Sequence, residues 1–317
     1  MRLFILTIFL IAPKIFGMLQ SADGDSLNSS VNKIPLFAIN SVIPNSLNST
    51  NNHSGEFDPL KNNVDYTLLA YTGGLTLAVG TGLHIYQANA WWQEQDSKFR
   101  IINDWNYSLW QDKLGHFYGT NLIAHALAGA LEAANVQTEE STVISGLTAL
   151  AFELFIEIED GFGPQWGFSP GDATANVLGA GFFISQYYFP IMKNFLIKAS
   201  YYPSPKFLAG QHKGGIIIDD HEGWKYWMSV RVKELLPRKA AEYWPSFLMI
   251  AGGMGVDNLD GVGGGRREFY IALDYDMETL PLYGGFWQFF KSTFNYWHFP
   301  MPGIRVTQGG AFFVLSY

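Results

Sequence analysis

The sequence predicts an α+β fold, in which an apolar bundle of about four helices is followed by a C-terminal antiparallel β region. Two observations indicate the helices: long apolar stretches between residues 65 and 193, and polar residues that recur within them at a spacing of four. A third observation indicates the strands. After Pro190 the chain changes to short segments of alternating residues separated by Pro and Gly clusters. We therefore expect a helical domain at 65–193 and a β domain at 194–317.

The composition limits the classes of function. Aromatic residues make up 16% of the 317 residues and charged residues only 15%, which indicates extensive contact with a large core or with lipid. A net charge of -8 and the lack of a basic tract argue against nucleic acid as a partner. With no cysteine, the sequence has no thiolate nucleophile, no disulfide framework and no cysteine for lipid attachment.

The first 64 residues predict a signal and a spacer. Residues 1–18 read as a secretory signal peptide, because Met1 and Arg2 precede an apolar run that is too short to span a bilayer. Residues 19–64 are rich in Asn and Ser and lack periodicity, as is typical of a disordered polar spacer. We therefore expect a protein of the bacterial cell envelope, periplasmic or associated with the outer membrane after the signal peptide is cleaved.

The bundle region divides into four predicted helices, at about 66–86, 112–134, 139–158 and 170–188. The first is apolar throughout, and its glycines suit either close helix packing or passage through a bilayer. The third has an acidic start, which suits a helix N-terminus. Ser169 and Pro170 read as the N-cap and first position of the fourth helix.

The β region contains six predicted strands, at 196–202, 214–219, 224–233, 246–256, 266–276 and 303–317. In the third of these, alternation predicts that the face carrying Tyr226 and Met228 is buried. The glycine-rich run 260–265 reads as a hairpin loop. A short helix is expected at about 287–297, and its aromatic residues favour contact with a membrane. The last residues are similar to the final strand of an outer-membrane barrel, but we favour a sheet that packs on the helices.

Three polar clusters lie within the apolar helices, and each contains a pair of residues four apart: Asp112 and His116, Glu153 and Glu157, Asp172 and Asn176. Residues four apart share one face of a helix. Ionisable groups are costly to bury among apolar helices unless they pair with one another, bind a metal or do chemistry. The sequence therefore predicts that three helices turn these pairs inward to build one shared site.

Three interpretations of this site stay open. The first is a structural network that fixes the packing of the helices, supported by Lys113, Asp160, Ser169 and Asn176. The second is acid–base catalysis by Asp112, His116, Glu157 and Asp172. The third is a divalent metal as cofactor, with the ligands His116, Asp112 and Glu157.

Three motifs carry a family resemblance: Asp112-Lys-x-x-His116-Phe, Glu157-x-x-Asp160-Gly, and Trp166-Gly-x-Ser169-x-x-Asp172-x-x-x-Asn176. With them, the segment from about Trp105 to Gln186 resembles the YfiM-like family of predicted periplasmic proteins, whose biochemical function is not established. More distantly, it is similar to VanZ-like membrane proteins. The C-terminal part looks like that of extended members from Bacteroidota. The chain departs from the lipoprotein members because it has no cysteine. The resemblance implies an envelope location and a site, but no reaction.

These observations lead to two functional hypotheses. The first is a membrane-associated structural or accessory component of the envelope, with membrane lipid and envelope proteins as partners and a buried Asp/His/Glu cluster. The alternative is an envelope hydrolase or transferase that acts on a lipid or cell-wall precursor through His116 and the neighbouring carboxylates. The sequence does not decide whether the protein is an enzyme. An enzyme site needs an opening to His116, whereas a structural network needs none.

Overall fold

Four long helices and a six-stranded sheet make up the computed structural model, which describes residues 63–92, 98–211, 216–261 and 263–316. This arrangement confirms the predicted fold class. The predicted signal peptide, and all but the last two residues of the predicted spacer, lie outside the described residues. All described residues belong to one unit of the chain, Ser54–Tyr317.

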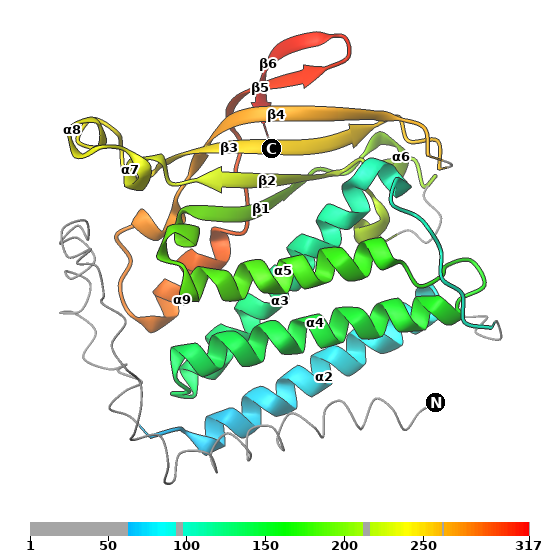
Figure 1. Cartoon of the computed structure of the whole chain (residues 1–317), viewed down its shortest axis with the longest axis horizontal. Helices are drawn as coiled ribbons and strands as arrows, with labels where there is room; N and C mark the ends of the chain where they lie inside the picture. Colours follow the sequence, from blue (N-terminus) through cyan, green and yellow to red (C-terminus); the bar gives the residue numbers. More distant parts are fainter. Residues whose placement is uncertain (1–62, 93–97, 212–215, 262, 317) are drawn as a thin grey trace, which may run out of the picture. The chain divides into compact units, whose positions relative to one another are not determined.

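The long helices are α2 (Tyr66–Ala90), α3 (Gln111–Ala133), α4 (Thr138–Phe162) and α5 (Pro170–Tyr188). Helices α3, α4 and α5 contact one another pairwise, and α2 contacts α3 (Figure 1). Local signals set their starts. The Asp65 carboxylate accepts a hydrogen bond from the Leu68 amide at the start of α2. Ser169 Oγ accepts one from the Asp172 amide at the start of α5, which confirms Ser169 as an N-cap.

The sheet is an antiparallel meander in the order β1-β2-β3-β4-β5-β6, so each strand pairs with the next one along the chain. Its strands are β1 (Phe195–Tyr201), β2 (Trp224–Val230), β3 (Leu248–Asp257), β4 (Arg266–Tyr275), β5 (Met301–Thr307) and β6 (Gly310–Ser316). Short helices connect these elements: η3 (Tyr107–Trp110), η4 (Pro190–Asn194), α6 (Pro205–Leu208), η5 (Ile217–Asp219), α7 (Val232–Leu235), α8 (Arg238–Ala241), η6 (Met277–Thr279) and α9 (Gly285–Phe294). The predicted loop at 260–265 joins β3 to β4, as expected of a hairpin.

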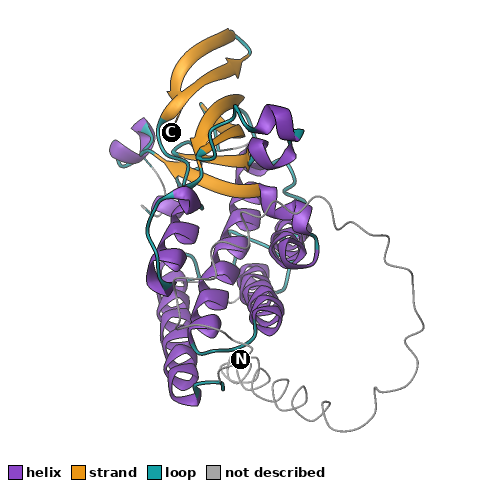
Figure 2. Cartoon of the chain, turned by 90° about the vertical axis from the view of Figure 1, so that its left-hand side faces the viewer, coloured by secondary structure: helices purple, strands orange, loops and turns teal. Residues whose placement is uncertain are grey.

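The two faces of the sheet have different neighbours (Figure 2). On one face, Tyr226 reaches α3, where a Cβ added to Gly115 would meet its hydroxyl at 3.0 Å. The Tyr226 ring lies 5.7 Å from that of Tyr118, also in α3. On the other face, Trp227 is 1% exposed and packs in a core of the sheet itself. Helix α3 therefore contacts both the bundle and the sheet.

The orientation predicted for β2 is wrong. Trp227 and Ser229 are buried, while Met228 is 37% exposed. Ser229 Oγ donates a hydrogen bond of 2.6 Å to Asp274, so this buried hydroxyl has a partner on β4. The residues of β2 do alternate between two faces. The prediction assigned Ser229 to the solvent-exposed face because it is polar, but its hydroxyl is buried with a hydrogen-bond partner.

Three predicted strands also differ. Residues 217–219 form the 3-10 helix η5, because the Asp220 carboxylate accepts hydrogen bonds from Tyr201 and the Ser204 amide and holds a turn there. Strand β2 ends at Val230, since Val232 already begins α7. The segment 303–317 is not one strand: β5 and β6 form a hairpin with Gly310 at a positive φ of 130°.

Glycines serve packing in α5 but not in α2. A Cβ added to Gly179 would lie 2.5 Å from the backbone oxygen of Phe117 in α3, whereas Gly181 has nothing within 4 Å. Gly73, Gly74 and Gly82 of α2 likewise have nothing within 4 Å. Of the two roles that the sequence suggested for the α2 glycines, close helix packing is thus wrong for these three.

Among the residues that the structure describes, two helices are long and apolar enough to cross a membrane, Tyr66–Asn89 and Thr138–Phe162. They differ in burial. Helix α4, the second, contacts α3 and α5 and buries Glu153 and Glu157. Helix α2 exposes apolar side chains, with Tyr71 72% and Leu75 66% exposed.

Candidate functional site

The three polar clusters meet around the imidazole of His116. Its Nε2 lies 3.9 Å from Oδ1 of Asp112, 3.6 Å from Oε1 of Glu157 and 3.9 Å from Oδ1 of Asp172. These residues come from α3, α4 and α5, so three helices build one site. The distances are longer than hydrogen bonds, which end near 3.2 Å for nitrogen and oxygen. Nε2 and three carboxylate oxygens therefore converge without touching.

The other ring nitrogen has closer neighbours. Nδ1 of His116 lies 3.3 Å from Oδ1 of Asn176 and 3.7 Å from Oε2 of Glu153. The same Asn176 oxygen accepts a hydrogen bond of 3.0 Å from Thr120 Oγ1. Asn176 is fully buried, and its Nδ2 has no hydrogen-bond partner among the residues that the structure describes. Asn176 thus orients the ring from one side and leaves Nε2 to the carboxylates.

Lys113 is the cation that neutralises part of this cluster. Its Nζ lies 2.7 Å from Asp104, 3.1 Å from Asp112 and 2.9 Å from Asp172, and its side chain is 8% exposed. Burial alone would lower the pKa of Lys113, but the charges of Asp112 and Asp172 outweigh it and raise the pKa. Lys113 therefore stays charged at all physiological pH values.

Burial and mutual repulsion give the carboxylates of the cluster different pKa values. Burial raises the pKa of Glu157 to about 8, and the charge of Asp172 adds to the rise. Burial and the charge of Asp112 raise the pKa of Asp172 to about 7. Asp112 itself has a lowered pKa, because the positive charges of His116, His221 and Lys113 outweigh its burial. The cluster therefore holds more buried carboxylates than its own cations stabilise in the ionised form.

His116 responds to the same surroundings. Burial alone would lower its pKa, but its interaction with Glu153 and the charges of Asp112 and Asp172 raise it well above the ordinary value. The side chain of His116 is 20% exposed and that of Asp112 is 18% exposed, whereas that of Glu157 is 2% exposed. Glu157 is thus closed off from solvent, whereas His116 and Asp112 are partly exposed.

The entry into α3 is strained. Ser108, Leu109 and Trp110 have positive φ angles of 44°, 56° and 79°, although none is glycine. Each such residue costs about 1 kcal/mol or more. Arg267 holds the segment, since its Nε donates to the Leu109 carbonyl at 3.1 Å and its guanidinium lies 5.4 Å from the Trp110 ring. This strained segment ends two positions before Asp112.

Residues 102–188 match the family described as "Predicted periplasmic lipoprotein (DUF2279)". No curated protein and no solved structure matched the chain. The matched segment contains α3, α4 and α5 and all residues of the cluster. The match supports membership of an uncharacterised periplasmic family and confirms the predicted envelope location. It does not confirm the likeness to YfiM-like or VanZ-like proteins, and the 317 residues contain no cysteine for a lipid anchor of the lipoprotein kind.

Two predicted site residues lie around the cluster rather than in it. The Asp160 carboxylate accepts a hydrogen bond of 2.6 Å from Trp92 Nε1, which ties the residues after α2 to α4. Burial raises the pKa of Asp160 to about 6. Ser169 caps α5, and its Oγ donates a hydrogen bond of 2.5 Å to Asp104. The Ser169 amide donates to Glu157 at 3.2 Å, so this residue positions a carboxylate of the cluster.

Sequence reasoning missed Asp104 and Thr120 as members of the site. Thr120 stands four residues after His116, so the same helix-face argument would have found it. Asp104 precedes α3 in a segment with no periodic pattern, and only the fold brings it to Lys113. Glu153 was predicted to share the inward face of its helix with Glu157 but was given no role, and its Oε2 lies 3.7 Å from His116 Nδ1.

The donor atoms fit a divalent cation. One ligand atom each from Asp112, His116 and Asp172 lies within 4.8 Å of the others, and Glu157 Oε1 lies 3.6 Å from His116 Nε2. The predicted ligand set was His116, Asp112 and Glu157, but the three residues whose ligand atoms lie together are His116, Asp112 and Asp172, without Glu157. One imidazole and two carboxylates suit Zn²⁺ or Mn²⁺, because imidazole favours zinc and carboxylates favour harder ions.

Proposed function

We propose that the protein is a membrane-associated component of the bacterial cell envelope whose helical bundle binds a divalent cation at the His116 cluster. One observation carries the proposal: His116 Nε2 lies 3.6–3.9 Å from oxygens of Asp112, Glu157 and Asp172, and ligand atoms of Asp112, His116 and Asp172 lie within 4.8 Å of one another. With bonds of about 2.0–2.4 Å to a cation, tetrahedral donors lie about 3.3–3.9 Å apart.

A cation accounts for this spacing better than a closed polar network does. Lys113 makes contacts of 2.7–3.1 Å within the same cluster, so these helices allow short ion pairs where two groups attract. Nε2 instead keeps its distance from all three carboxylates. The raised pKa values of Glu157 and Asp172 agree with a shortage of positive charge there. A bound cation supplies that charge and stabilises the packing of three helices.

Metal analysis of the purified protein tests this proposal. We expect nearly one equivalent of Zn²⁺ or Mn²⁺ by mass spectrometry, and a rise in melting temperature when the chelated protein is reloaded. His116→Ala should lose the metal, whereas His125→Gln, a change on the same helix outside the cluster, should keep it. If reloaded wild type carries no metal and its melting temperature does not change, the cation proposal is wrong and a structural network explains the cluster.

Helix α2 supports association with lipid. Residues 66–92 contain no Asp, Glu, Lys or Arg, and α2 exposes large apolar side chains along its length, including those of Tyr71, Leu75 and Val79. A helix that is apolar on all sides and exposed needs an apolar neighbour, and lipid is the neighbour that an envelope protein meets. Binding to phospholipid vesicles should fall when Leu75 and Val79 are both replaced by Gln. Equal flotation of variant and wild type with vesicles would refute this assignment.

Catalysis is a second candidate function, which two observations favour. The side chains of His116 and Asp112 are 20% and 18% exposed, and the strained segment 108–110 precedes them in the chain. The reaction would be hydrolysis or group transfer on a lipid or cell-wall precursor. A bound cation would polarise an ester or phosphoryl oxygen, while Lys113 would hold negative charge in place.

The order of the motifs also supports a relation to YfiM-like and, more distantly, VanZ-like proteins.

Phosphate release from farnesyl diphosphate in detergent micelles tests this second candidate. Metal-loaded wild type should release phosphate, and Asp172→Asn should lower the rate by at least about tenfold while keeping the fold. His125→Gln serves as the control. A metal-loaded protein with no activity on this substrate or on a phosphatidic acid would leave the cation with a structural role.

A further inference from the structure

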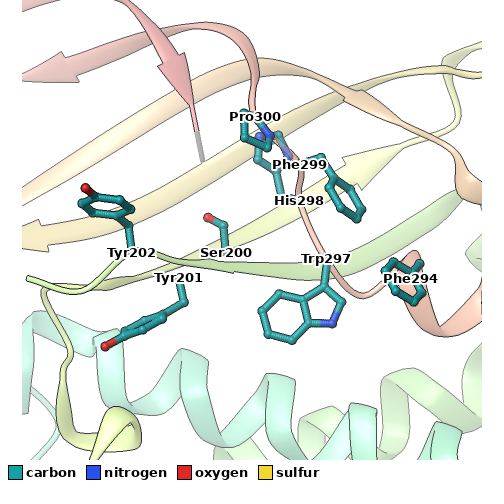
Figure 3. Close-up of a pocket in the computed structure, with 8 residues that line it drawn as sticks. All are labelled: Ser200, Tyr201, Tyr202, Phe294, Trp297, His298, Phe299 and Pro300. Atoms are coloured by element: carbon teal, nitrogen blue, oxygen red, sulfur yellow. The ribbon is translucent and has the colours of Figure 1, made fainter.

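A second candidate site lies at the edge of the sheet, in a cavity of about 780 Å³. It opens where the chain after α9 leaves β1: the His298 amide donates to the Ala199 carbonyl at 2.9 Å, and the following residues then diverge toward β5. Tyr202, Phe294, Trp297 and Phe299 form apolar walls, and Ser200 and His298 supply polar groups (Figure 3). Small-molecule sites commonly have about 300–1,000 Å³ and this mixture of apolar walls and few polar groups.

His298 is a buried side chain with an unused nitrogen. It is 4% exposed, and its ring stacks on Trp227 at a centroid distance of 3.8 Å. Nδ1 lies 3.2 Å from Oδ1 of Asp274. Neither Nδ1 nor Nε2 meets hydrogen-bond geometry with a residue in the described part of the chain, and Nε2 lacks even the close carboxylate that lies beside Nδ1. Buried polar atoms are nearly always paired, so an unpaired Nε2 in a residue that lines a cavity points to a ligand.

Asp274 determines which ring nitrogen of His298 carries the proton. Lys198 Nζ lies 2.8 Å from Asp274 Oδ2, and Ser229 Oγ donates to the same oxygen at 2.6 Å. Burial alone would raise the pKa of Asp274, but His298 and Lys198 hold it below its ordinary value. In the neutral imidazole, an ionised carboxylate beside Nδ1 favours the tautomer with its proton on Nδ1 and a lone pair on Nε2. In that tautomer Nε2 is a hydrogen-bond acceptor.

Ser200 provides the complementary group. Its Oγ accepts a hydrogen bond of 2.9 Å from Trp227 Nε1, so its own hydroxyl proton is available for a ligand. Trp227 contacts both polar residues, since His298 stacks on the ring whose nitrogen bonds Ser200. One acceptor and one donor close together match a ligand hydroxyl, which both donates and accepts.

An aromatic track leads away from these groups. Phe286, Phe290 and Phe294 stand four apart on α9, with ring centroids 6.4 Å and 4.3 Å apart along the series. Phe294 then lies 6.2 Å from Phe299 in a nearly parallel stack. Phe286 is 72% exposed at the far end. The track offers a continuous apolar surface that ends in the cavity.

We propose that this cavity binds one lipid-like molecule, a long apolar chain with a hydroxyl head. The hydroxyl donates to Nε2 of His298 and accepts from Ser200, and the chain lies along the aromatic track of α9. This inference is independent of the cation at the His116 cluster, because no residue is shared between the two sites.

Calorimetric titration of the full chain with two probes of equal length tests the proposal. The first probe, 1-decanol, carries a hydroxyl donor, while 1-methoxynonane has an ether oxygen and no donor. Wild type should bind 1-decanol roughly tenfold more tightly, the value of one hydrogen bond of about 1.4 kcal/mol. His298→Leu should abolish this preference. Phe294→Ala should weaken both probes alike, and Phe313→Ala, at a side chain that is 91% exposed on β6, should change neither.

Each other outcome overturns a stated part of the proposal. Equal affinity of wild type for both probes would refute the hydroxyl head, and no binding of either would refute the site. If His298→Leu does not fold, Ser200→Ala takes its place and should reduce the preference at least threefold; an unchanged preference would refute the donor. If phosphatidylcholine vesicles bind in a way that depends on Phe294 while neither soluble probe binds, the track is a membrane-contact surface and not a site for one molecule.

Discussion

Lys113 forms ion pairs with three carboxylates, those of Asp104, Asp112 and Asp172. Only Asp112 is adjacent to Lys113 in the sequence. All four side chains are at most 18% exposed, so their charges are only weakly screened by water. Removing one partner of a buried ion pair leaves the remaining charge uncompensated. This loss costs more free energy than the intact pair contributes to stability. Lys113 is therefore the residue of the cluster on which the metal-free fold depends most.

Replacing Lys113 by Met should lower the free energy of unfolding by about 3–5 kcal/mol, measured by urea denaturation of the chelated protein. The matched control is Arg266→Gln. Arg266 pairs with Asp257 at 2.7 Å, but the two side chains are 52% and 43% exposed, so the loss should stay below about 1 kcal/mol. Similar losses in the two variants would show that the buried pairs contribute no more than a surface pair.

His125 shows what the same helix does to a histidine without charged neighbours. Its Nε2 lies 2.9 Å from Thr293 Oγ1, and its ring stacks on Phe289 at 5.4 Å. Burial lowers the pKa of His125 to about 4, whereas the pKa of His116, nine positions earlier, is raised by its carboxylates. Surroundings alone separate these two side chains of α3.

The lowered pKa of His125 predicts a loss of stability in acid. His125 takes up its proton near pH 6.5 in the unfolded chain and only near pH 4 in the folded chain. The contribution of the neutral His125 to the free energy of unfolding is therefore complete above pH 6.5, and it is lost as the pH falls toward 4. The shift corresponds to about 3 kcal/mol. The free energy of unfolding of wild type should therefore fall more steeply across this window than that of His125→Gln. Parallel profiles would contradict the prediction.

At the scale of elements, the contact between α3 and α5 depends on one small residue. Gly179 brings α5 so close to α3 that a Cβ there would lie 2.5 Å from the Phe117 oxygen and 3.1 Å from Cβ of Thr120. Phe117 and Thr120 lie in the turn that directly follows His116, so this contact sets the distance between His116 and Asp172. A backbone oxygen within a helix cannot move away alone, because its neighbours in the helix move with it.

Gly179→Ala should therefore push the two helices apart and lower the free energy of unfolding by about 1–3 kcal/mol. Gly181→Ala on the same helix has open space and should raise it by up to about 1 kcal/mol, since alanine favours a helix over glycine. Thermal denaturation compares the two. In the metal-binding assay, Gly179→Ala should also bind the cation more weakly than wild type. Two variants of equal stability would refute the close-contact argument.

At the scale of the whole molecule, α3 joins the bundle to the sheet. On one side it packs with α4 and α5, and on the other Tyr118 donates a hydrogen bond of 3.1 Å to the Tyr296 carbonyl and stacks near Tyr226. Both layers therefore lose part of their buried surface if either unfolds. The sequence predicted two domains at 65–193 and 194–317, and this shared helix predicts that they unfold together.

The bundle and the sheet should unfold in one transition. Far-UV circular dichroism follows mainly the helices, and near-UV circular dichroism follows the tryptophans, among them the fully buried Trp227 of the sheet. Their midpoints in a thermal scan should agree within about 2 °C. Two separated transitions would show that α3 does not couple the layers and that the predicted domains are independent.

The sequence by itself determined the order of helices and strands, the N-cap of α5, the hairpin between β3 and β4 and the pairing of polar residues on helix faces. These features depend on neighbours within a few positions, where spacing and capping decide the conformation. The orientation of β2 depended on a partner 45 positions away, because Ser229 is buried only where Asp274 accepts its proton. The spacing of His116 from three carboxylates, the arrival of Asp104 at Lys113 and the unpaired nitrogen of His298 were decided by tertiary structure. Burial and distance between remote segments set these properties, and no local pattern encodes them.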